Sequence, residues 1–156
     1  MRLLLPFICL LLLGDVLPVR LAVAGDSFAP DRHFSLADPA RLDPGAAERA
    51  YGQVKADMAA RFAVSREPAA LSYQRWWRIN RSPYLSATHG SRYVNTYVNR
   101  PAWAYGTLAP GAAMPVGSII AKDAVSVDSA GRALPGALAL MEKMPPGYDR
   151  AARDWR

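Results

Sequence analysis

The stretch RYVNTYVN, residues 92–99, decides how the rest of this chain can be interpreted. Aromatic and β-branched residues of this kind favour extended structure. Successive side chains of a strand point to opposite faces. The stretch therefore presents two sets, Tyr93, Asn95 and Tyr97 on one face and Val94, Thr96 and Val98 on the other. It predicts a strand, and the similar composition after Pro68 predicts that this whole half of the chain is sheet.

Two further apolar runs follow this strand. They are VGSIIAKDAVSV, residues 116–127, and ALALMEKM, residues 137–144. The connector DSAGRALPG, residues 128–136, has the composition of a turn. Two adjacent runs joined by a short connector predict an antiparallel pair. The Pro-Pro-Gly at 145–147 should end the second strand, and Asp154-Trp155-Arg156 should begin another.

The segment before the sheet predicts a helix. In PGAAERAYGQVKADMAARFAVSRE, residues 44–67, apolar side chains recur at steps of three and four, as on one face of a helix. This stripe consists of Ala47, Ala50, Tyr51, Val54, Met58 and Phe62. Asp43 can cap the helix, and Pro44 suits its first position. The predicted fold class is α+β, with this N-terminal helix packed on a mainly antiparallel sheet.

The first residues predict a signal peptide over residues 1–24. Arg2 precedes an apolar run, and the small residues Ala22 and Ala24 frame a cleavage site between Ala24 and Gly25. The run is about half the roughly 20 residues that span a bilayer, so no stable membrane anchor is expected after cleavage. Residues 25–43 should form an extended arm, and residues 44–156 a single domain.

The composition of the chain narrows the classes of function that it can have. The 156 residues carry a net charge of +6, with the arginines scattered singly, so a nucleic-acid-binding tail is not indicated. Cys9 is the only cysteine and lies in the predicted signal peptide, so the exported chain would have no thiol. The segment YQRWWRINRSPY, residues 73–84, could cap the core with its tryptophans, or offer a cation–π surface to an anionic polymer.

No triad, metal-spaced histidine pair or phosphate-binding glycine loop is present. The chain has two histidines, His33 and His89. A single histidine is more often a structural hydrogen-bonding residue than a ligand, and this is the role expected for both.

Four blocks in order resemble the cytochrome P-460 family of exported bacterial haem proteins. They are HGSRYVNTYVN, MPVGSIIAKDAVSV, ALALMEKMPPGYD and DWR, and the resemblance covers about residues 76–156. The resemblance implies a mainly antiparallel domain that holds one haem c in the periplasm. It implies oxidation of hydroxylamine or binding of nitric oxide, with a periplasmic electron-transfer partner. Whether the protein forms a homodimer is left open.

The resemblance carries one functional residue over to this chain, and the other candidates are chosen from their positions around such a haem. Lys122 matches the lysine that cross-links to the haem edge in the hydroxylamine-oxidising members. Its apolar neighbours could lower its pKa by desolvation; the alternative is an ordinary strand lysine. Tyr97 and Met141 would contribute to the haem wall, together with Tyr93 and Met144, unless all four are simply core. Glu142 could transfer protons, or it is an exposed strand carboxylate.

In the resembled family the segment that begins with Asp-Trp continues to a CxxCH motif, which binds the haem. Residues 1–156 contain no CxxCH motif, so they do not supply the ligands that covalent attachment of haem c needs. Two explanations stay open: the chain is part of a longer product, incomplete at its C-terminus, or it is a member without the haem segment. The alternative function is a haem-free periplasmic module that binds a small ligand or a partner.

Overall fold

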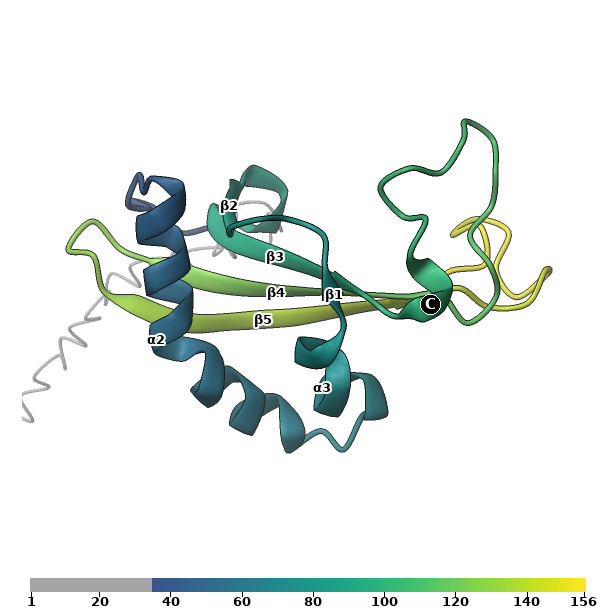
Figure 1. Ribbon diagram of the computed structural model, residues 1–156, viewed down its shortest axis with the longest axis horizontal. Helices are drawn as coiled ribbons and strands as arrows, with labels where there is room; N and C mark the ends of the chain where they lie inside the picture. The colour runs from purple at the N-terminus through teal and green to yellow at the C-terminus, as the bar shows by residue number, and fades with distance from the viewer. Residues whose placement is uncertain (1–34) are drawn as a thin grey trace, which may run out of the picture.

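The fold is an antiparallel sheet with one long helix across it (Figure 1). The structure, a computed structural model, describes residues 35–156. The predicted signal peptide, its cleavage site and His33 lie outside these residues. The strands are β1 (Trp77–Arg78), β2 (Tyr84–Ser86), β3 (Arg92–Val98), β4 (Ile119–Val127) and β5 (Ala133–Glu142), and the long helix is α2 (Pro44–Ala63). The predicted α+β class is confirmed.

The predicted stretch becomes β3, the strand in the middle of the sheet. The strand order is β1-β3-β4-β5, and β2 also pairs with β3; all pairs are antiparallel. Thr96 lies opposite Lys122, and Tyr97 lies opposite Ala121. Residues that are directly opposite in a pair share a face, so the register assigns every side chain of β4 and β5 to one of two faces.

Helix α2 begins as the sequence predicts. The Asp43 carboxylate accepts a hydrogen bond of 2.7 Å from the Ala46 backbone N–H, and Pro44 is the first helical residue. The buried residues of α2 are Ala47, Ala50, Tyr51, Val54 and Met58. Phe62 is half-buried and packs against the same core. The apolar stripe therefore attaches the helix to the sheet.

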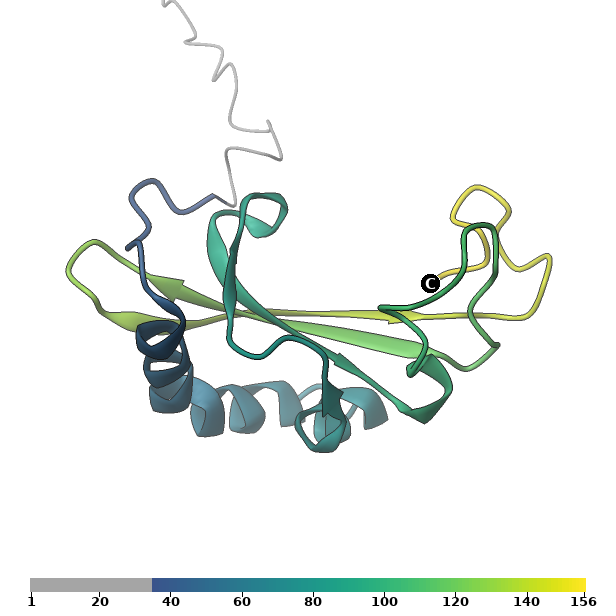
Figure 2. The ribbon, with the colours of Figure 1, turned by 45° about the horizontal axis from the view of Figure 1, so that its top comes forward.

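The two faces of the sheet have different coverings (Figure 2). On one side lie α2 and the short helix α3 (Pro68–Ser72); we call this the helix face, and it carries Tyr93, Asn95, Tyr97, Ala121, Asp123 and Val125. On the other side rise the short 3-10 helix η2 (Ala87–His89), the β3–β4 loop and the C-terminal segment. We call this the open face, and it carries Thr96, Lys122, Ala124, Ser126, Ala139 and Met141.

Strand β5 begins earlier than the sequence predicts, so the predicted turn over 128–136 is wrong in its second half. The turn closes at Gly131, whose N–H donates to the Asp128 carbonyl at 2.8 Å. Pro135 is tolerated because β5 is an edge strand. A bulge lies opposite Ala124, and a Cβ on Gly136 would lie 2.6 Å from the Ala124 carbonyl oxygen. Only glycine allows this close approach.

The C-terminal residues pair with the sheet, as the sequence predicts. Trp155 forms an antiparallel bridge with Lys143, and the backbones of Arg156 and Glu142 exchange two hydrogen bonds of 3.0 Å. The other end of the described chain is also attached: Tyr93 accepts a hydrogen bond from the Leu42 N–H and donates one to the Ala40 carbonyl. The phenol of Tyr93 therefore fixes the arm against the sheet.

The tryptophan-rich segment caps the core. It forms the 3-10 helix η1 (Tyr73–Arg75) and β1, with Trp76 packed against the main core and Trp77 55% exposed. None of the helices within residues 35–156 is both long enough and apolar enough to cross a membrane.

Candidate functional site

A cavity of about 570 Å³ lies on the open face of the sheet. Its floor comes from β4 and β5, and η2 with the residues around it forms one wall. The lining residues are Ser35, Ala87, Thr88, His89, Gly90, Arg92, Lys122, Ala124, Ser126, Pro135, Gly136, Ala137 and Ala139. The side chains of the floor are short, because alanine and glycine dominate it. This composition leaves room for a ligand above two adjacent strands.

The charged groups of this cavity are all basic. Lys122 and Arg92 line it, and the described lining residues include no carboxylate. Arg92 is held in place: its Nε donates to Ser126 Oγ at 3.1 Å, and its Nη1 donates to the His89 carbonyl at 3.3 Å. Lys122 is half-buried and, within residues 35–156, forms no hydrogen bond or ion pair through its amine.

His89 is the titratable neighbour of Lys122. Its Nδ1 lies 2.8 Å from Ser86 Oγ and 3.2 Å from Thr88 Oγ1. Burial lowers the pKa of His89, and the positive charge of Lys122 lowers it further. The imidazole is therefore neutral at neutral pH. His89 forms hydrogen bonds, as expected, and the structure adds that it also lines the cavity.

The structure does not bring the four candidate residues together. Lys122 lines the cavity, and Met141 lies on the same face, 41% exposed, outside the lining. Tyr97 and Glu142 lie on the helix face, because they pair with Ala121 and Ile119. Lys122 and Tyr97 therefore lie on opposite faces of the sheet. A haem wall made by both would need side chains from the two faces.

The surroundings of Glu142 differ from those expected of a proton donor beside a haem. Its carboxylate accepts a hydrogen bond of 2.9 Å from Arg156 Nε, and the two residues also form an ion pair. Glu142 lines a smaller hollow beside Glu67 and Ala69, on the α3 side of the sheet. Its nearest described partner is therefore an arginine, and the sheet separates it from Lys122.

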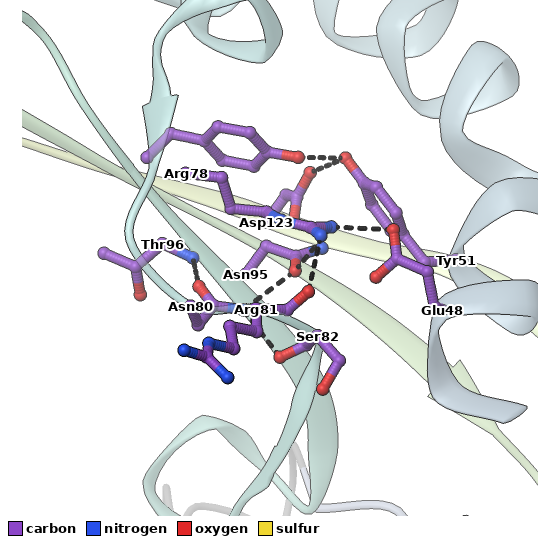
Figure 3. Close-up of polar contacts among 10 residues, drawn as sticks. Glu48, Tyr51, Arg78, Asn80, Arg81, Ser82, Asn95, Thr96 and Asp123 are labelled. Atoms are coloured by element: carbon purple, nitrogen blue, oxygen red, sulfur yellow. Dashed lines mark hydrogen bonds and ion pairs between the residues drawn. The ribbon is translucent and has the colours of Figure 1, made fainter. Parts of the chain in front are cut away.

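A buried polar cluster lies between α2 and the sheet (Figure 3), and Tyr97 belongs to it through its hydrogen bond with Tyr51. Asp123 is the centre of this cluster and is 0% exposed. Its Oδ2 accepts hydrogen bonds from the hydroxyls of Tyr51 at 2.9 Å and Tyr73 at 3.0 Å. The hydroxyl of Tyr97 lies 2.7 Å from that of Tyr51, and since the Tyr51 proton goes to Asp123, Tyr97 is the donor.

Burial determines the protonation chemistry of this cluster. It raises the pKa of Asp123, although the hydrogen bonds from Tyr51 and Tyr73 oppose the rise. The pKa values of Tyr51 and Tyr73 are also raised, first by burial and then by the charge of Asp123. The phenol protons therefore stay on the tyrosines across the physiological range.

The side of the cluster nearest the surface is charged. Arg78 Nη1 donates to Glu48 Oε1 at 2.9 Å and approaches Asn95 Oδ1 at 3.5 Å, as Figure 3 shows. Asn95 Oδ1 also accepts from Asn80 Nδ2 at 3.0 Å. Asp123 Oδ1 and Asn95 Nδ2 are buried without a hydrogen-bond partner, yet these residues are directly opposite in the register. The Asn95 side chain nevertheless acts on Asp123, because it lowers the pKa of that carboxyl against the rise caused by burial.

Sequence reasoning missed Asp123 and Arg92. Asp123 gave a partial signal, because an acidic residue inside an otherwise apolar strand needs polar partners when it is buried. That these partners are tyrosines on the same face follows only from the pairing of β3 with β4. Arg92 gave no local signal, since its position beside the cavity depends on the pairing of β3 with β4. No group of three or more potential metal-ligating side chains occurs in residues 35–156.

Comparisons with protein-family models, with curated proteins and with solved structures find no match to this chain.

Proposed function

We propose that this protein is an exported haem-binding redox protein that resembles cytochrome P-460, with the open-face cavity as its haem site. One observation carries the proposal. Lys122, the residue that the resemblance singles out, lies in the cavity of about 570 Å³, with a floor of small residues. The volume is within the roughly 300–1,000 Å³ range of ligand sites.

The residues present fit part of a haem. A macrocycle needs a flat apolar surface, and Ala124, Ala137 and Ala139 offer one on two adjacent strands. Its carboxylates need basic partners, and Lys122 and Arg92 are basic. The thioether bonds of haem c need cysteines, and residues 35–156 contain none. The described residues therefore suit a non-covalently held macrocycle, and covalent attachment would require residues outside them.

Haem would supply electron exchange and binding of hydroxylamine or nitric oxide. The protein side chains would hold and tune it. Lys122 presents its amine to the cavity. His89 presents an imidazole that is neutral because its pKa is lowered, and its Nδ1 is held by Ser86 and Thr88. A neutral imidazole oriented through one nitrogen can accept a proton or bind a metal through the other.

The proposal revises the proton-transfer residue. The sequence suggests Glu142, the only carboxylate inside the late strand, but this carboxylate lies on the other face and is paired with Arg156. His89 lines the cavity, and its lowered pKa keeps its imidazole neutral and able to accept a proton. Export to the periplasm, a periplasmic electron-transfer partner and a substrate such as hydroxylamine or nitric oxide belong to the same proposal.

Haemin titration of the purified exported chain tests this function. We expect saturable 1:1 binding with a shifted Soret band, and extraction of all the haem into acidified acetone, because residues 35–156 supply no thioether. Lys122→Ala should weaken binding, because it removes a basic partner of the carboxylates. Lys55→Ala is the matched control, since Lys55 is exposed on α2 and lies above the Tyr51 ring. Absence of saturable binding, or equal binding by both variants, would overturn the proposal.

A further inference from the structure

We infer that the open-face cavity binds a free amphipathic carboxylate, with the carboxylate against Lys122 and the apolar body along Ala124 and Ala139. The proposal concerns the same cavity as the proposed function. It rests on that cavity being a ligand site and does not require haem.

The first argument is charge. Lys122 carries a positive charge that no carboxylate within residues 35–156 neutralises by an ion pair. The next residue, Asp123, points to the helix face, where its carboxylate accepts hydrogen bonds from Tyr51 and Tyr73. A half-buried ammonium in a hollow without carboxylates attracts an anion, because no neighbouring negative charge offsets its own.

The second argument is shape. Lys122, Ala124 and Ser126 alternate onto the open face of β4, so the floor extends about 13 Å from Lys122 to Ser126. Across the pair, Ala139 lies opposite Lys122, and the bulge at Gly136 lies opposite Ala124. Between Lys122 and Ser126, the floor has only short apolar side chains. A ligand with one anionic end and an elongated apolar body matches this arrangement.

The third argument concerns His89 and supplies an independent readout. The charge of Lys122 contributes to the low pKa of His89, so the two groups interact. An anion bound to Lys122 would offset this charge, and the pKa of His89 should then rise. The chain has only one other histidine, His33. A His89→Gln variant therefore assigns the NMR signal without ambiguity.

Calorimetry with two matched probes tests the inference. Laurate and dodecylammonium share one apolar chain and differ in the sign of the charge. Titrated as monomers into the purified exported chain, laurate should bind 1:1 and raise the pKa of His89, and dodecylammonium should bind at least tenfold more weakly. Lys122→Gln should weaken laurate binding about tenfold or more, as expected for a hydrogen bond to a charged group. Lys55→Gln should leave it unchanged.

A second variant keeps the test valid if Lys122→Gln affects folding. Ala139 is exposed on the cavity floor, so Ala139→Leu should fill the floor without disturbing the core. This variant keeps Lys122 and should still lose laurate binding. Equal binding of both probes, or a laurate affinity that neither substitution changes, would overturn the inference. Laurate binding without haemin binding would support it and overturn only the proposed function.

Discussion

At the residue scale, Tyr51 links α2 to the sheet by polar contacts inside the core. Its hydroxyl donates to Asp123 and accepts from Tyr97, and Tyr51 itself is 2% exposed. Removing this hydroxyl leaves Asp123 with one phenol donor and leaves the Tyr97 proton without its acceptor. Tyr51→Phe should therefore lower the free energy of unfolding by about 1–3 kcal/mol, measured by urea denaturation.

The matched control is Tyr84→Phe. Tyr84 is 43% exposed, so its hydroxyl can bond to water in either variant. This change should alter the free energy of unfolding by less than about 0.5 kcal/mol. Equal effects of the two substitutions would show that the polar cluster does not stabilise the fold.

The raised pKa of Asp123 predicts that the stability of the fold depends on pH. Burial raises its pKa in the folded protein above the value of 3.8 expected when the chain is unfolded. Its contribution to stability is therefore fully present below about pH 3.8, and is lost as the pH rises through the folded pKa. Asp123→Asn removes this titration. The stability of the native protein relative to Asp123→Asn should fall as the pH rises over this range.

Urea denaturation of both proteins at a series of pH values measures this difference. The other titrating groups are common to the two proteins, so most of their effects cancel. A difference that stays constant, or that increases with pH, would contradict the raised pKa of Asp123.

At the element scale, two glycines have opposite roles. A Cβ on Gly136 would lie 2.6 Å from the Ala124 carbonyl oxygen, whereas a Cβ on Gly52 would meet no atom within 4 Å. Gly136→Ala should lower the free energy of unfolding by about 1–3 kcal/mol, because the bulge must shift. Gly52→Ala should raise it by about 0.5–1 kcal/mol, because alanine favours the middle of a helix.

Thermal or urea unfolding of the two variants measures these opposite signs. Since both changes add one methyl group, the pair is its own control. A Gly136→Ala protein as stable as the native one would mean that the bulge does not require a glycine.

At the scale of the whole molecule, export is the expectation that the structure leaves open. The signal peptide should be removed between Ala24 and Gly25, because small residues frame that bond. Intact mass of the protein in the periplasmic fraction should therefore correspond to a chain that begins at Gly25. Ala24→Tyr should block cleavage, since a bulky residue does not suit the site. A full-length mass in the native protein would contradict this prediction.

The sequence by itself determined the elements whose pattern is local. Alternation in residues 92–99 predicted which side chains of β3 share a face, and the register confirms it. The stripe in residues 44–67 predicted the buried face of α2, and Asp43 predicted its beginning. Such predictions succeed because a strand or helix of known periodicity orients its side chains whatever its partners are.

Only the tertiary structure decided which residues form the cavity. Lys122, His89 and Arg92 come together because β3 pairs antiparallel with β4 in one register, and a shift of one residue would turn Lys122 to the other face. The register of β5 with β4 separates Lys122 from Glu142, because Glu142 lies opposite Ile119 and therefore on the other face. The bulge at Gly136 changes the pairing within β5, where the sequence predicted a turn. These outcomes depend on contacts between distant segments, so no local pattern could specify them.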